Sequence, residues 1–141
     1  MAQQTTTAGG SILLDVVALR SGVAYRAAEL MRRRMGAAVM ASCPPTSEEY
    51  AAIRLLVATW DAIAARVRAG DIPVDPFFET NPVSHMWEAL VSAINIIKGT
   101  TPGYADNFRW LYKRYKKWLD QSDKSRRYRT AARGGMNSGF G

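Results

Sequence analysis

Apolar residues along this chain recur every three or four positions, the spacing that places them on one face of an α-helix. Four stretches have this spacing, at about residues 11–35, 46–69, 82–98 and 103–120. No stretch of useful length alternates apolar and polar residues as a half-buried strand does. The pattern therefore predicts an all-α protein, a small bundle of four main helices.

The second and third stretches have clear apolar faces. In the second stretch the face consists of Ile53, Leu56, Val57, Trp60, Ile63, Ala64 and Val67. In the third it consists of Val83, Met86, Trp87, Leu90, Val91, Ile94 and Ile97. Since such faces pack against other elements, we expect these side chains to form the bundle core.

Local signals mark several helix ends. Thr46, followed three residues later by Glu49, has the spacing of a capping box, in which the two side chains satisfy backbone amides at a helix start. Gly70 lies where a left-handed C-terminal cap is expected. Gly22 lowers the helix propensity inside the first stretch and is consistent with a close helix crossing there.

The fourth stretch combines six aromatic and five basic residues in Tyr104 to Leu119. Helical spacing divides it into two faces. The predicted core face comprises Tyr104, Phe108, Leu111, Tyr115 and Trp118. The remaining positions carry most of the charge and leave Trp110 and Tyr112 on the outside.

The two ends of the chain differ in composition from the bundle. Residues 1–10 are small and polar, which predicts a flexible arm. Residues 121–141 are basic and end in glycines, with too few apolar residues to fold alone, which predicts a basic tail. We therefore expect one helical bundle domain at residues 11–120, in keeping with a chain of 141 residues.

Charge is distributed unevenly along the chain. Residues 1–108 carry nine basic and ten acidic residues, whereas residues 109–141 carry ten basic and two acidic residues. A nearly neutral body with a basic C-terminal end indicates an anionic partner: nucleic acid, an anionic membrane surface or an acidic protein. Three consecutive arginines, Arg32 to Arg34, also end the first stretch. We interpret them as a solvated helix end, with an anion-binding patch as the alternative.

The order of several residues resembles an uncharacterised all-helical family of bacteria and phages, one of the domains of unknown function. The similarity covers about residues 50–118, and the residues that carry it are Trp60, Arg66 to Gly70, Ile72, Phe77, Phe78, Trp87, Tyr104, Asn107, Phe108 and Leu111. The resemblance implies a helical fold and transfers no catalytic residue. Many members of that family have a membrane helix before the bundle, and this chain departs from them in lacking one.

Few residues have the chemistry that an enzyme needs. His85 is the sole histidine and Cys43 the sole cysteine, so neither a histidine metal site nor a thiolate cluster can form within one chain. The scattered carboxylates form no recognisable acid/base pair. We therefore expect no enzymatic activity, no catalytic residue, no metal and no cofactor. No signal peptide or transmembrane helix is expected either, which suggests a location in the cytoplasm or on the cytoplasmic face of a membrane.

These observations favour an accessory or structural subunit that docks on a larger protein or nucleoprotein assembly. The candidate partner-binding residues are Arg109, Trp110, Lys113, Arg114, Lys117, Arg126, Arg127, Arg129 and Arg133. Nucleic-acid binding by the same surface is an alternative, because cations and aromatic rings together bind single strands. A peripheral membrane-surface protein is a second alternative, and a merely solvated charged face is a third interpretation of the charges.

Overall fold

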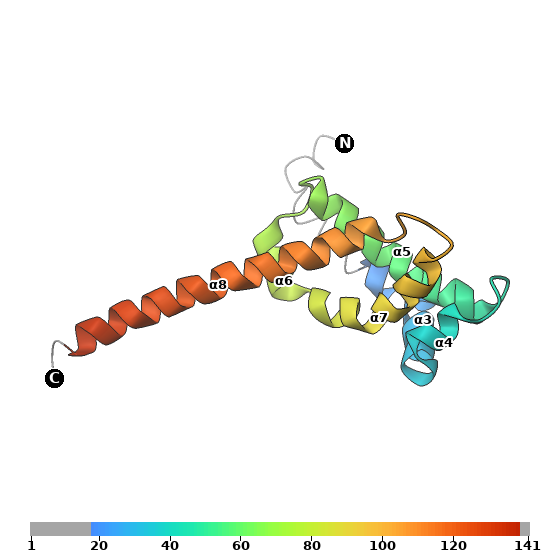
Figure 1. Cartoon of the computed structure of the whole chain (residues 1–141), viewed down its shortest axis with the longest axis horizontal. Coiled ribbons are helices and arrows are strands. Elements are labelled where there is room, and N and C mark those ends of the chain that lie inside the picture. The colour runs from blue at the N-terminus through green and yellow to red at the C-terminus, as the bar shows by residue number, and fades with distance from the viewer. Residues whose placement is uncertain (1–17, 139–141) are drawn as a thin grey trace.

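The computed structural model describes the backbone of residues 18–138 and the side chains of residues 18–123. Within these limits the protein is all-α, as predicted, and contains no strand. After a helical turn at residues 18–21 the elements are α3 (Val23–Met35), α4 (Ala37–Ala41), α5 (Glu48–Arg68), α6 (Val74–Thr80), α7 (Val83–Lys98) and α8 (Asp106–Ser138). Helices α3 to α7 gather at one end of the molecule, and α8 leaves them along its longest axis (Figure 1).

Helix α5 is the centre of the bundle and packs against α3, α4 and α8. Its buried residues are the seven predicted for its inner face. Helix α7 buries six of its seven predicted residues, with Ala93 buried in addition and Val91 only half-buried. The predicted core of these two helices is therefore confirmed apart from Val91. In each helix one regular face is buried against the neighbouring helices.

Two of the predicted helix ends can be compared directly with the structure. Gly70 has a φ of 85°, the left-handed conformation predicted for it. The cap of α5, however, is Ser47 rather than Thr46, since the Ser47 hydroxyl accepts a hydrogen bond from the Tyr50 amide at 3.1 Å. Neighbouring hydroxyl residues can both serve as caps, and the spacing alone chose the wrong one.

The first predicted helix is interrupted. Gly22 has φ −62° and ψ 153°, an extended conformation, and α3 begins only at Val23. A Cβ at Gly22 would meet nothing nearer than the Leu19 carbonyl oxygen at 3.9 Å, so no close helix crossing explains this glycine. Its low helix propensity at an exposed position accounts for the break. The predicted start near residue 11, like the arm at residues 1–10, lies outside the described residues.

Helix α8 differs most from its predicted bounds of 103–120, since it begins at Asp106 and continues to Ser138. Residues 102–105 form turns, and Ala105 has a φ of 60°, which excludes it from the helix. Beyond residue 120 the sequence loses its apolar period but contains no proline and many good helix formers. An apolar face is needed for a helix to pack, not for a helix to form, and most of the predicted tail is accordingly helical.

Candidate docking surface on helix α8

The start of α8 is fixed to α5 by a side-chain cap from another helix. The Asp61 carboxylate accepts a hydrogen bond from the Phe108 amide at 3.0 Å and one from the Asn107 side chain at 3.5 Å. A carboxylate at this position satisfies a free backbone donor and favours the positive end of the helix dipole. Asp61 therefore determines where α8 begins and in which direction it leaves the bundle.

Two residues of the predicted core face hold α8 in the bundle. Phe108 and Leu111 are fully buried. The Phe108 ring stacks on Trp60, with centroids 5.7 Å apart, and meets the ring of Trp87 edge-on at 5.1 Å. Both distances lie within the range favoured by aromatic pairs. The first two turns of α8 thus belong to the core of α5 and α7.

The other three residues of that face are half-buried and not part of the fully enclosed core. Tyr115 and Trp118 cover Phe78 of α6, at centroid distances of 5.3 Å and 5.5 Å. The Trp118 indole donates a hydrogen bond to the Asp75 carboxylate at 2.7 Å. The predicted face is therefore correct in direction, and its burial decreases along the helix because only the short α6 lies beneath its later turns.

The two aromatic residues predicted on the outside are also engaged with the bundle. Tyr112 stacks on Trp87 at a centroid distance of 5.2 Å and an interplanar angle of 12°. Trp110 is half-buried, and the guanidinium of Arg68 lies 5.5 Å from its ring centroid. Neither ring face is fully available to stack on a nucleic-acid base.

Arg109 packs inward. Its guanidinium lies 5.2 Å from the ring centroid of Trp87, and its Nε is buried with no hydrogen-bond partner in the described part of the chain. Cation–π contacts of this kind stabilise the packing of a half-buried arginine. Arg109 is thus a candidate residue whose side chain the fold itself uses.

The remaining candidates lie on two parts of α8. Lys113 and Lys117 are exposed and Arg114 is half-buried, all on the part that contacts the bundle. Arg126, Arg127, Arg129 and Arg133 belong to the part that projects beyond it (Figure 1). Sequence reasoning missed Arg68, which joins this surface from the end of α5; its only signal was a position in the last turn of that helix.

The charge of α8 determines what it can bind. Its 33 residues include ten basic and three acidic residues. Arginine forks bind carboxylate and phosphate groups in pairs of parallel hydrogen bonds, and lysines add point charges. The hydrogen bond and ring contact of Trp118 hold α8 to α6, and the helix continues for twenty residues from Leu119 to Ser138.

The residues considered for chemistry lie apart from one another. His85 is exposed at the start of α7, and the Cys43 thiol, in the loop before α5, donates a weak hydrogen bond to the Val39 carbonyl oxygen at 3.3 Å. Over the described residues, no three His, Cys, Asp or Glu side chains gather as a metal site would require. Nor does any helix there have the length and apolar content to cross a membrane. Comparisons with protein-family models, with curated proteins and with solved structures gave no match.

Proposed function

We propose that this protein is a non-catalytic helical subunit that docks on a larger protein or nucleoprotein assembly through α8. The observation that carries the proposal is the division of α8 into an attached half and a projecting half. The attached half is fixed by Asp61, Phe108 and Leu111. The projecting half carries Arg126, Arg127, Arg129 and Arg133 away from the bundle.

The physical basis is a helix whose orientation is set before it meets its partner. A helix that is polar all round is stable in a protein when it bridges to another body or is supported by charge pairs. Because a preformed helix loses less conformational entropy on binding than an unstructured tail, the same contacts give higher affinity. An acidic or phosphate-lined groove would complement its net positive charge.

The docking proposal is tested by removing charge from α8 without changing its fold. The double variant Lys113→Gln/Lys117→Gln removes two exposed cations from α8, and Arg34→Gln/Lys98→Gln removes two exposed cations from other helices. The assay is sedimentation of native cell extract, in which the tagged wild-type protein is expected to migrate with a large assembly. The α8 variant should dissociate at lower salt than the control variant. Equal behaviour of both variants, or a wild-type protein that migrates alone, would contradict docking through α8.

A truncated chain ending at Leu119 provides the second test. It keeps every described contact between α8 and the bundle, so it should fold with nearly the wild-type stability and leave the assembly. Unfolding of this variant would mean that the later part of α8 belongs to the bundle, and the docking proposal would then fail.

Nucleic-acid binding is a second candidate, favoured by the density of basic residues in α8. It predicts an affinity for labelled single-stranded or duplex oligonucleotides that falls steeply as salt is raised, with a smaller salt slope for Lys113→Gln/Lys117→Gln. Since Tyr112 already stacks on Trp87, replacing it with Leu should not abolish such binding. Sedimentation with anionic vesicles at low salt tests the membrane alternative, and absence of binding there would exclude it.

A further inference from the structure

A pocket of about 430 Å³ lies between α3 and the start of α7, away from the surface of α8. Its volume is within the range of small-molecule pockets in proteins. Its lining includes Arg20, Arg26, Leu30, Arg33, His85 and Met86. Three arginines and a histidine around one concave surface make it a candidate site for an anion.

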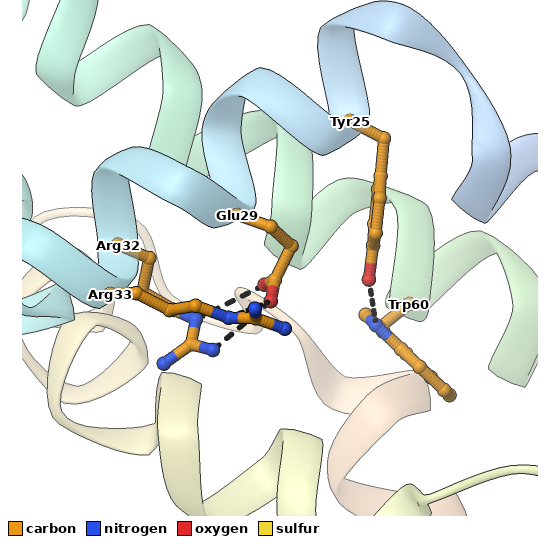
Figure 2. Close-up of polar contacts among 5 residues, drawn as sticks. All are labelled: Tyr25, Glu29, Arg32, Arg33 and Trp60. Carbon is orange, nitrogen blue, oxygen red and sulfur yellow. Dashed lines mark hydrogen bonds and ion pairs between the residues drawn. The ribbon is translucent and has the colours of Figure 1, made fainter.

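The only carboxylate in this lining is already neutralised by an arginine outside it. Arg32 donates two hydrogen bonds to Glu29, from Nε to Oε1 at 3.1 Å and from the terminal nitrogen to Oε2 at 3.0 Å (Figure 2). The same bonds raise the pKa of the Arg32 guanidinium. Arg33 approaches Glu29 only to 3.9 Å, with a largely exposed side chain. The arginines of the lining therefore leave the pocket with an excess of positive charge.

Arg20 is held at the pocket in a defined position. One terminal nitrogen donates a hydrogen bond to the Asn81 side-chain oxygen at 3.0 Å, and the guanidinium lies 4.9 Å from the ring centroid of Trp60. Its Nε is buried and has no partner among the described groups. A buried donor without a partner costs free energy, and the bond to Asn81 and the contact with Trp60 keep the charge of Arg20 beside the pocket.

The arrangement of side chains indicates a ligand with an apolar part. Arg26, Leu30 and Arg33 follow one another on the same face of α3, at helical spacing of four and three residues. Leu30 is 59% exposed, although it is a large apolar residue, and Met86 lies opposite on α7. Arginines beside an exposed apolar side chain can bind an oxyanion while Leu30 covers a carbon skeleton, and Met86, itself buried, supports this wall from α7.

We propose that this pocket binds a small organic phosphate. Its charge matches a phosphate ester, whose oxygens accept the paired hydrogen bonds that arginines donate. The proposal is independent of docking through α8, because it uses α3 and α7 only. For Arg33 the proposal takes up the alternative of an anion-binding patch in place of a solvated helix end.

The probe is phenyl phosphate, titrated into the full-length protein and followed by amide shifts in two-dimensional NMR. We expect saturable binding with shifts concentrated on α3 and at His85 and Met86. Inorganic phosphate should bind more weakly, because it cannot use the apolar wall, and benzyl alcohol, which lacks the charge, should not bind. Shifts spread over α8, no saturation, or equal affinity for inorganic phosphate would overturn the proposal.

Matched variants separate the pocket from general surface charge. Arg26→Gln and Arg33→Gln each remove a lining arginine and should weaken phenyl phosphate binding about tenfold, the loss expected for one charge-assisted hydrogen bond. Arg34→Gln removes the same charge next to Arg33 but outside the lining, and it should change the affinity less than about twofold. All three arginines are exposed, so thermal unfolding without ligand should be unchanged. Equal weakening by Arg34→Gln would show that only net charge matters and would refute a built site.

Discussion

Two tyrosines allow the same chemical change to be made in opposite hydrogen-bonding environments. The Tyr25 hydroxyl accepts a hydrogen bond from the Trp60 indole nitrogen at 2.9 Å inside the core (Figure 2). The Tyr104 hydroxyl is also buried but has no partner within the described structure. Replacing either residue with Phe removes one oxygen atom and keeps the ring. The two substitutions are expected to change the free energy of unfolding in opposite directions.

The size of each effect depends on whether the lost hydroxyl had a hydrogen-bond partner. Trp60 is fully buried, so Tyr25→Phe leaves its indole donor unsatisfied, and we expect a loss of about 1–3 kcal/mol. Tyr104→Phe removes a polar atom that was buried without compensation, and we expect a gain of about 1 kcal/mol. A difference of roughly 2 kcal/mol or more should therefore separate the two variants.

Urea denaturation followed by far-UV circular dichroism measures both changes. The midpoint should move in opposite directions while the m-value stays constant, because neither substitution changes the surface exposed on unfolding. Tyr112→Phe is the control, since it keeps the ring that stacks on Trp87 and none of the hydrogen bonds described for residues 18–123 uses its hydroxyl. Its effect should remain within about 0.5 kcal/mol. If Tyr25→Phe and Tyr104→Phe shift the midpoint in the same direction, hydroxyl pairing does not control these positions.

The pH dependence of stability gives an independent check on Tyr104. Burial raises the pKa of Tyr104 to about 12, and the charge of Arg54 opposes this rise while Tyr50 and Asp61 add to it. Because the folded-state pKa lies above the ordinary tyrosine value of about 10, the unfolded chain loses this proton first. Stability should be complete below about pH 10 and should decrease as the pH rises towards 12. Tyr104→Phe should show a smaller decrease, and an unchanged alkaline decrease would contradict this assignment.

Three further predictions concern α8. Phe108→Ala should lower the free energy of unfolding by about 3–5 kcal/mol, whereas Trp118→Ala should cost about 1–3 kcal/mol because Trp118 is only half-buried; equal losses in urea denaturation would contradict this gradient. Asp61→Ala should cost about 1 kcal/mol through loss of the α8 cap, and Asp61→Asn should restore most of it, as the same denaturation assay measures. Ser125→Pro should reduce helical circular dichroism without moving the urea midpoint, because it breaks α8 after Trp118, whose ring and hydrogen bond hold the helix to α6; a lowered midpoint would show that the projecting half supports the bundle.

Apolar spacing in the sequence predicted the buried residues correctly where neighbouring helices cover one helix face completely. In α5 the predicted and observed buried residues coincide, because every turn meets α3, α4 or α8. The attached part of α8 followed its pattern less closely. Tyr115 and Trp118 have the spacing of core residues, but how deeply they are buried depends on the length of α6, which their own spacing does not encode.

Contacts between distant residues could not be predicted from spacing. The cap that Asp61 provides for α8 and the contact of Arg68 with Trp110 each join residues more than forty positions apart. The interruption at Gly22 and the extension of α8 to Ser138 have a different cause. Both depend on local backbone preference without support from packing, which a search for apolar faces does not register.

The position of α8 explains why a helix without an apolar face can still have a fixed direction. At 1.5 Å per residue, the twenty residues from Leu119 to Ser138 extend about 30 Å, comparable to the width of a small domain. An isolated helix must form its first turn before it can grow, and this nucleation is unfavourable in water. Here the nucleus already exists, since Asp61, Phe108 and Leu111 fix the first turns against α5. Each added residue therefore needs only the favourable step of propagation, so the order of the projecting helix depends on the folded bundle.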